Sequence, residues 1–220
     1  GVKAAPAMLK AKRFVKKTKR GGVLTVTSEH YLRRDIWCGY FRCTVCKNAV
    51  PKLVDGDILV PDTNVVLHQL DLLENAKIDN VVLLSTVLEE VKHRDMGVYT
   101  RVRALAANAD RHFYVFTNEH FKPTYIDRLP RESPNDRNDR AIRVAAKWYA
   151  EHVQEALGGD TMVTEEGVAR VVLLTNDADN RAKAVADGLH AVTMRDYVVG
   201  DLKSPELEDL LPMAPAAAAA

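Results

Sequence analysis

Four acidic residues, each placed after or beside an apolar run, indicate a shared chemical site. They are Asp62, Glu90, Asp139 and Asp177. If the apolar runs are neighbouring parallel strands, the acids that follow them meet at one edge of the sheet. Clustered carboxylates repel one another, so such a site is tolerated chiefly when hard divalent cations bind among them. The pattern therefore favours metal-dependent hydrolysis of a phosphodiester.

The three cysteines form a second group with chemical potential. Cys38, Cys43 and Cys46 are the only cysteines and have the spacing C-x4-C-x2-C. Three thiols cannot all pair as disulfides within one chain. Close spacing in a loop without periodicity favours zinc, which takes four tetrahedral ligands. A fourth ligand must then come from another part of the chain, and three free thiols are the alternative.

Length and composition are typical of one domain with appendages. The chain has 220 residues, of which 47% are hydrophobic, which excludes wholesale disorder. No apolar stretch approaches the roughly 20 residues that a membrane helix needs. Lysines interrupt the first apolar residues, which argues against a signal peptide. We expect a soluble intracellular protein without a membrane partner.

Positive charge is concentrated at the start of the chain. The net charge is only +1, but residues 1–34 hold ten Lys and Arg against one acid, Glu29. The dense block Lys16–Arg20 suits phosphate contacts or a nuclear address, and a solvated basic arm is the alternative. We expect the protein in the nucleus (nucleolus) and the cytoplasm.

The order of the elements predicts an α/β domain with a central, mostly parallel sheet. Continuous apolar runs are typical of parallel strands that helices cover on both faces. We expect strands at 23–27, 58–60, 81–84, 113–116, 171–174 and 191–194. We expect helices at 65–74, at 86–94 with Ser85 or Thr86 as its cap, and at 99–107, 137–157 and 179–187, the last stopped by Gly188.

The same pattern predicts four segments. Residues 1–7 are expected to be a leader, and 8–56 a basic arm with an irregular Cys-rich loop. Residues 57–200 form the main domain. Residues 201–220, rich in Pro, acid and Ala, are expected to be a flexible tail.

Helical geometry separates acids that are adjacent in sequence. In the helix at 86–94, Glu90 lies about 107° from the centre of the buried face and Glu89 about 153° away. Glu90 is therefore expected at a cleft edge and Glu89 in solvent. On the long helix Asp139 borders the buried face, whereas Asp136 lies opposite. The alternative is ordinary capping, with Asp136 as the N-cap of the long helix and Asp177 as a cap after its strand.

Several ordered motifs resemble the PIN nuclease domain. They are Pro61-Asp62-Thr63-Asn64, Glu90-Val91, Asn135-Asp136-Arg137-Asn138-Asp139-Arg140-Ala141-Ile142-Arg143 and Thr175-Asn176-Asp177. More narrowly, residues 8 to about 200 resemble the amino-terminal region of the RNase II-like nuclease family of the eukaryotic RNA exosome. The resemblance implies a PIN fold and a Mn²⁺- or Mg²⁺-dependent endoribonuclease that cuts single-stranded RNA. It also implies tethering to the core ring subunits of the exosome.

The resemblance also assigns ligands. Its four metal-binding acids correspond to Asp62, Glu90, Asp139 and Asp177. Its cysteine motif is completed by a histidine of the long helix, and the matching position is His152. That residue lies 13 positions beyond Asp139, roughly 20 Å along the helix, so the zinc is expected to be structural.

The expected mechanism is two-ion hydrolysis. Two cations about 4 Å apart activate a water and stabilise the departing 3′-oxygen, which leaves 5′-phosphate and 3′-hydroxyl ends. Thr175 and Asn64 are candidates for orienting the ligands. Arg94, Arg137 and Arg140 could meet phosphates, or could be solvated surface residues.

Two other functions are compatible with the sequence. The chain could be mainly a docking module of the exosome with minor nuclease activity. It could also be a haloacid-dehalogenase-like phosphatase, which likewise begins with an Asp after a strand. In that class the partner acid stands two residues further on, where this chain has Asn64, so a phosphatase is disfavoured.

Overall fold

The computed structural model confirms an α/β fold built on a five-stranded parallel sheet. It describes residues 7–17, 22–46, 50–157 and 169–211. The strands lie in the order β5-β4-β3-β6-β7, and every neighbouring pair is parallel. They are β3 (Asp57–Pro61), β4 (Val81–Leu84), β5 (Phe113–Phe116), β6 (Arg170–Leu174) and β7 (His190–Val192).

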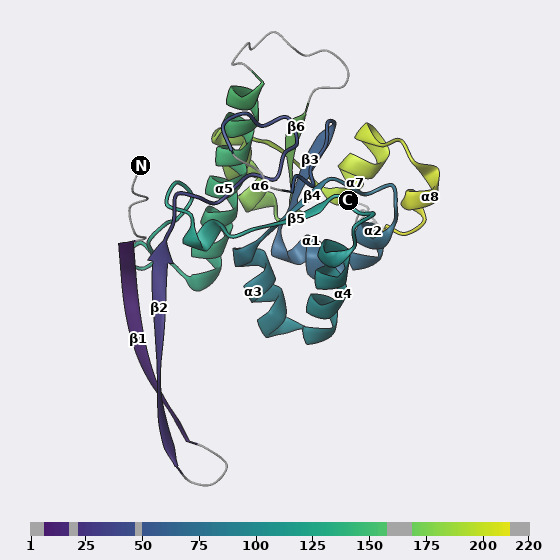
Figure 1. The fold of residues 1–220 in the computed structure, drawn as a ribbon. Coiled ribbons are helices and arrows are strands. Elements are labelled where there is room, and N and C mark those ends of the chain that lie inside the picture. Colours follow the sequence, from purple (N-terminus) through teal and green to yellow (C-terminus); the bar gives the residue numbers. More distant parts are fainter. Residues whose placement is uncertain (1–6, 18–21, 47–49, 158–168, 212–220) are drawn as a thin grey trace.

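Helices cover both faces of this sheet. They are α1 (Thr63–His68), α2 (Leu70–Glu74), α3 (Ser85–Arg94), α4 (Met96–Ala107), α5 (Pro134–Ala156) and α6 (Ala178–Ala186). Right-handed crossovers place α1 to α4 on one side and α5 with α6 on the other, as Figure 1 shows. The direction of the connections reverses between β3 and β6. Ligands of such sheets bind at this switch point, outside the carboxyl ends of the strands.

Three helix boundaries or caps differ from the prediction. The helix expected at 65–74 is two helices, because the backbone leaves the helical region at Gln69. The long helix begins at Pro134 rather than near 137, since Ser133 caps it. Neither Ser85 nor Thr86 caps α3. Instead the side-chain oxygen of Asn118 accepts a hydrogen bond from the Thr86 amide at 3.2 Å.

A long hairpin replaces the predicted basic arm. Strands β1 (Ala7–Lys17) and β2 (Val23–Leu32) pair antiparallel and project from the body (Figure 1). Only the short strand at 23–27 was predicted, and Ala7, expected in a leader, belongs to β1. The closely spaced Lys and Arg residues of β1 hide its alternation. The base of the hairpin is fixed by His30, whose Nε2 lies 2.7 Å from the carbonyl oxygen of Glu119.

The chain after β7 is ordered further than expected. It forms α7 (Met194–Asp196), a π-helical turn η2 (Tyr197–Asp201) and α8 (Pro205–Glu208). Leu207 and Leu211 are buried against the body, so the prediction of a flexible tail from residue 201 is wrong as far as Leu211. The remainder of that predicted tail lies outside the described residues.

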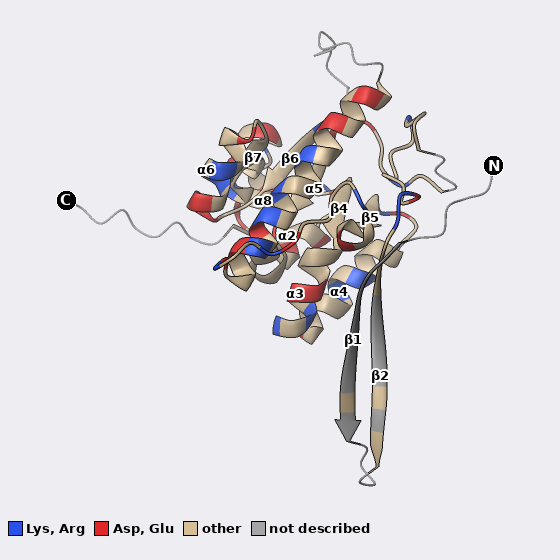
Figure 2. Cartoon of the chain, turned by 90° about the vertical axis from the view of Figure 1, so that its left-hand side faces the viewer, with Lys and Arg blue, Asp and Glu red and all other residues tan. Residues whose placement is uncertain are grey.

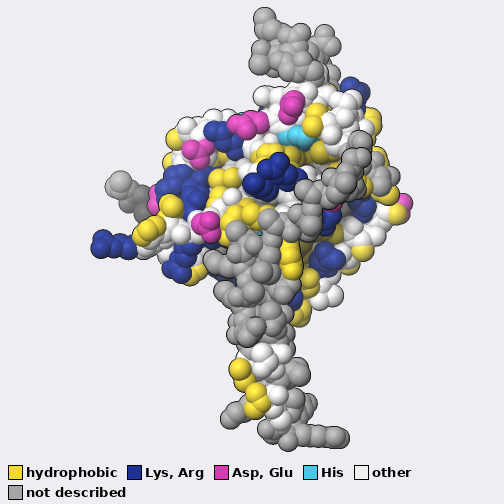
Figure 3. Space-filling model, turned by 60° about the vertical axis from the view of Figure 1, so that its left-hand side comes forward, with side chains coloured by type: hydrophobic (Ala, Val, Ile, Leu, Met, Phe, Trp, Pro, Cys, Tyr) yellow, Lys and Arg dark blue, Asp and Glu magenta, His cyan; other side chains and the backbone are white. Residues whose placement is uncertain are grey.

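Charge is distributed over the body and is not segregated. Figure 2 shows acidic and basic stretches interspersed along the helices. On the face shown in Figure 3, Lys and Arg side chains alternate with hydrophobic ones beside the hairpin. Within the described ranges, none of the helices is long and apolar enough to cross a bilayer.

The Cys-rich loop is irregular, as predicted, but it is firmly packed on the body. The carbonyl oxygen of Cys38 accepts a hydrogen bond from the Tyr149 hydroxyl of α5 at 2.8 Å. The carbonyl oxygen of Trp37 accepts one from Tyr114 of β5 at 2.8 Å. Gly39 has a φ of 76° and lies against the Tyr114 ring, where a Cβ atom would come within 2.7 Å. The tight approach of this loop therefore depends on glycine.

Gly39→Ala should lower the free energy of unfolding by about 2–4 kcal/mol, because left-handed strain adds to a clash with a packed ring. Gly188→Ala is the matched control, since Gly188 also has a positive φ of 84° but no atom within 4 Å of the new Cβ. Its cost should be limited to about 1 kcal/mol. Urea denaturation measures both, and equal losses would contradict the role of the Tyr114 contact.

Candidate functional site

The four predicted acids converge at the carboxyl end of the sheet. Asp62 follows β3 and Asp177 comes shortly after its neighbour β6, while Asp139 and Glu90 approach from α5 and α3. Their charges interact. Burial and the charges of Asp177, Asp62 and Glu90 together raise the pKa of Asp139 to about 6.

Two of the acids are held by helix capping. One oxygen of Asp62 accepts a hydrogen bond from the Val65 amide at 2.7 Å, and one of Asp177 accepts from the Asn180 amide at 2.8 Å. The capping alternative is thus correct as geometry for Asp177, and Asp62 caps α1 in the same way. A carboxylate has about four acceptor positions, so each of these two acids keeps further oxygen lone pairs available after capping.

Glu90 is largely buried and Glu89 is exposed, which is the order that helical geometry predicts. The Glu90 side chain is 14% exposed and that of Glu89 61%. One oxygen of Glu90 accepts hydrogen bonds from the Thr63 hydroxyl at 2.9 Å and from the Asn138 side chain at 3.2 Å. Sequence reasoning missed both partners, although Thr63 and Asn138 each stand next to a predicted acid.

Asp139 and Asp136 are also separated as expected. Asp139 is half-buried and accepts a hydrogen bond from the Asn135 side chain at 3.1 Å, whereas Asp136 is exposed. The proposal that Asp136 is the N-cap of the long helix is wrong, because the Ser133 hydroxyl accepts from the Asp136 amide at 3.0 Å.

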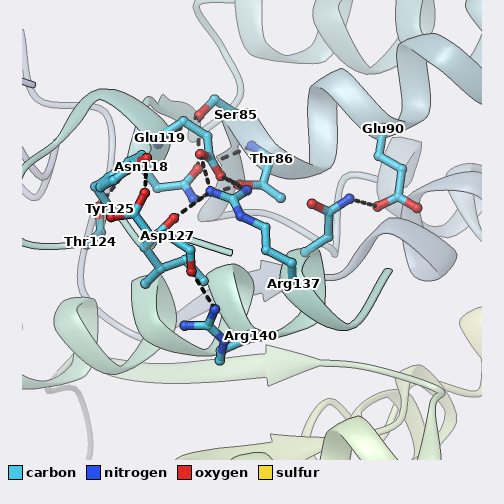
Figure 4. A network of polar contacts seen from close by, with 12 residues as sticks. Ser85, Thr86, Glu90, Asn118, Glu119, Thr124, Tyr125, Asp127, Arg137 and Arg140 are labelled. Carbon is cyan, nitrogen blue, oxygen red and sulfur yellow. Dashed lines mark hydrogen bonds and ion pairs between the residues drawn. The ribbon is translucent and has the colours of Figure 1, made fainter. Parts of the chain in front are cut away.

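A partly buried ion pair fixes the start of α5 beside the acids (Figure 4). Both nitrogens of the Arg137 fork donate to Glu119 at 2.6 Å, and the Thr86 hydroxyl donates to the same carboxylate at 2.6 Å. Although burial acts to raise the pKa of Glu119, these hydrogen bonds hold it below its ordinary value. The pair connects the loop after β5 to α3 and α5, and no sequence pattern indicated it.

Of the residues suggested as auxiliary groups, Thr175 contacts a predicted acid through its side chain as expected, whereas the three arginines pair with carboxylates. Arg94 pairs with Glu90, Arg137 with Glu119 and Arg140 with Glu132, so each contacts a carboxylate. The buried Thr175 hydroxyl hydrogen-bonds Asp62 and acts to lower the pKa of that acid. The Asn64 side chain is exposed, and only its backbone acts on Asp62.

The cysteines and the predicted histidine form a compact cluster. The ligand atoms of Cys38, Cys43, Cys46 and His152 all lie within 4.8 Å of one another. His152 Nε2 is 3.2 Å from the sulfurs of both Cys43 and Cys46. Burial lowers the pKa of His152, which favours the neutral form that binds metal. Three sulfurs and one nitrogen at these separations fit a tetrahedral structural zinc.

An aromatic stack holds this histidine in place. The Trp148 ring stacks on that of His152 with centroids 4.5 Å apart, and it also stacks on the Phe116 ring at 5.2 Å. Among the described residues this is the only group of three or more candidate ligands within such short range of one another. The four acids do not form such a group, so their arrangement is more open.

Comparison with known proteins agrees with this geometry. A family model described as "PIN domain" matches residues 59–195. The chain is 49% identical over 204 residues to "Exosome complex exonuclease RRP44 homolog A" of Arabidopsis thaliana, and 44% identical over 218 residues to "Exosome complex exonuclease RRP44" of Homo sapiens. Both alignments cover 93% of this chain but only 20% and 22% of the relatives, so the chain spans about a fifth of their length.

A solved structure supports the same assignment. The structure described as the T. brucei RRP44 PIN domain is 34% identical to this chain, with a TM-score of 0.70. The match covers 82% of this chain and 99% of that one. The chain therefore belongs to the PIN-domain family of nucleases, in which it matches the amino-terminal region of the exosome exonucleases RRP44 and Dis3.

Proposed function

We propose that this chain is a divalent-metal-dependent endoribonuclease that cuts single-stranded RNA. The observation that carries the proposal is the convergence of four acids from four elements at the switch point of the sheet. A fold that places partly buried carboxylates within reach of one another's charge accepts repulsion that bound Mn²⁺ or Mg²⁺ would relieve.

The residues of the site would act as ligands and as positioning groups. Asp62, Glu90, Asp139 and Asp177 would hold two ions, none of them being a covalent nucleophile. Thr63 and Asn138 hold the Glu90 carboxylate from two sides, and Thr175 holds Asp62. When bound, the cations supply an activated water and stabilise charge on the departing 3′-oxygen, so that 5′-phosphate and 3′-hydroxyl ends result.

We further propose that the Cys38, Cys43, Cys46 and His152 cluster binds a structural Zn²⁺. Its histidine lies 13 residues beyond Asp139, roughly 20 Å along α5, so the cluster is remote from the acids. Its effect would be to fasten the Cys-rich loop to α5, in addition to the hydrogen bond between Tyr149 and Cys38.

A second candidate function, docking to the core ring of the RNA exosome, has its own observation. The Cys-rich loop exposes large apolar side chains, with Phe41 48% exposed, Val45 52% and Val50 74%. Exposed apolar groups gathered on one loop are typical of a protein interface. The curated relatives are named exosome exonucleases, so we propose tethering alongside cleavage, and with it a nuclear and cytoplasmic location.

Asp139→Asn should abolish Mn²⁺-dependent linearisation of a circular single-stranded RNA, with a loss of at least about 100- to 1000-fold, because a charged ligand becomes neutral. Glu90→Gln should behave alike. Glu89→Gln is the matched exposed control and should cleave normally. A folded Asp139→Asn protein that still opens the circle would refute the site.

The same variant separates cutting from tethering. Asp139→Asn should still capture exosome core subunits in a pull-down, because the Cys-rich loop is untouched. If the protein without substitutions captures the core subunits but leaves the RNA circle intact, the result would instead support the docking module. A phosphatase would also leave the circle closed.

Asp139→Asn should stabilise the protein in EDTA. The folded pKa of Asp139, about 6, lies above its ordinary value of 3.8. This carboxyl therefore contributes its full stability below about pH 4 and loses it as the pH rises through about 6. The variant should gain on the order of 1 kcal/mol in unfolding free energy near pH 7.5 and nothing near pH 4. Urea denaturation measures both, Mn²⁺ should reverse the order at the higher pH, and a variant less stable in EDTA would contradict the repulsion.

Elemental analysis should find one zinc per chain, lost in His152→Ala. Without the metal, the Cys-rich loop should become sensitive to limited proteolysis while the nuclease body resists. The exposed His68→Ala is the control and should retain zinc. Zinc that persists in His152→Ala would move the fourth ligand to another residue.

A further inference from the structure

The pocket that contains two of the acids is also lined by residues that carry hydrogen-bond donors and positive charge, and two of their donor atoms have no hydrogen-bond partner. It has a volume of about 100 Å³ and is lined by Asp139 and Asp177 together with Arg143, Asn180 and Lys183. Arg143 comes from α5, one turn beyond Asp139, and the other two come from α6. The proposed metal ligands account for the acids but not for these three residues.

Two of the donors are buried without a hydrogen-bond acceptor. The Asn180 residue is 2% exposed and the Arg143 side chain 11%. Arg143 Nη1 donates to the Asn180 side-chain oxygen at 2.6 Å, but Arg143 Nε and Asn180 Nδ2 have no hydrogen-bond partner. The Asp187 carboxylate is 3.6 Å from Nε, beyond hydrogen-bonding distance. Each buried unpaired donor costs about 1–3 kcal/mol, a cost that an acceptor would relieve if a small shift of these side chains brought it within hydrogen-bonding range.

The chemistry of these groups selects the ligand. Arg143, Asn180 Nδ2 and the exposed Lys183 offer donors and positive charge, which bind an oxyanion and repel a cation. The guanidinium fork matches the oxygens of a phosphate. Because the proposed cation ligands line the same pocket, a phosphate here would touch both the cations and the donors.

We propose that Arg143, Asn180 and Lys183 form a subsite for a phosphate of the RNA strand at the cleavage position. This inference rests on the proposed nuclease function and assigns it a substrate-binding residue set. The pocket is also lined by Asp136 and Asp179, so its carboxylates outnumber its two cationic side chains. The phosphate can therefore bind there only after divalent cations have offset the negative charge.

The test compares RNA affinity with metal affinity in three variants. They are Arg143→Gln, the exposed Lys183→Gln, and the matched control Lys147→Gln, an exposed lysine of α5 outside the pocket. Fluorescence anisotropy with a labelled single-stranded RNA in Ca²⁺ should show about 10-fold weaker binding for Arg143→Gln, about 3-fold for Lys183→Gln and no change for Lys147→Gln. In EDTA all should bind equally weakly. The Mn²⁺ affinity without RNA, measured by calorimetry, should stay within about 2-fold of the unchanged protein.

A substrate series locates the contact. Oligonucleotides that carry one neutral methylphosphonate linkage, moved stepwise across the cleavage position, should lose affinity for the unchanged protein at one linkage. With the neutral group at that linkage, Arg143→Gln should cause no further loss of RNA affinity, because the contact between Arg143 and the phosphate is already absent. Lys183 is exposed, so its variant tests the subsite even where Arg143→Gln folds poorly.

Three results would overturn the subsite. The first is that Arg143→Gln and Lys183→Gln both bind RNA in Ca²⁺ as tightly as the protein without substitutions does. Mn²⁺ affinity that falls as much as RNA affinity would show that Arg143 acts through the acids. The absence of any sensitive linkage would also exclude it. Failure of the nuclease proposal is distinct, since the unchanged protein would then neither bind Mn²⁺ nor cut the RNA circle.

Discussion

Mutual repulsion of carboxylates at the end of the sheet is the constraint on which the rest of this structure depends. The acids are brought together by the parallel order of β3 and β6, which places Asp62 and Asp177 side by side. Burial strengthens the repulsion, as the raised pKa of Asp139 shows. Much of the surrounding hydrogen bonding, from the helix amides to Thr63 and Asn138, holds these groups where they would otherwise separate.

The helix α5 connects the parts of the molecule that act. Over 23 residues it carries Arg137, Asp139, Arg143 and His152, in that order. Its start is fixed by the ion pair of Arg137 with Glu119, and its far half by aromatic packing of Trp148 and by the Cys-rich loop. A rigid helix with both ends anchored places Asp139 with little freedom. This precision is what a two-ion site requires, since its ligands must keep a fixed separation.

Sequence patterns predicted what depends on local order and missed what depends on distant partners. The predicted strands at 81–84 and 113–116 match the structure, because short continuous apolar runs are typical of parallel strands that are covered on both faces. The cap of α3 was misassigned because Asn118, more than thirty residues away, supplies it. The Glu119–Arg137 pair and the unpaired donor of Asn180 are invisible in sequence for the same reason. The resemblance to a family identifies His152 as the histidine of the Cys cluster. Its position on the helix is compatible with that role but does not by itself indicate it.

The two proposed metal sites differ in the kind of metal that their donors select. The site at the sheet edge offers carboxylate oxygens, which suit Mg²⁺ and Mn²⁺, whereas the cluster at His152 offers three sulfurs and a nitrogen, which suit Zn²⁺. Zinc binds most mixed ligand sets more tightly than manganese does, so affinity alone would favour zinc at both sites. Separation along α5 keeps the cysteines from completing a zinc site among the acids. Under the proposed function, the acids, in an open arrangement without sulfur, would then be available to the harder ions and to the phosphate oxygens that accompany them.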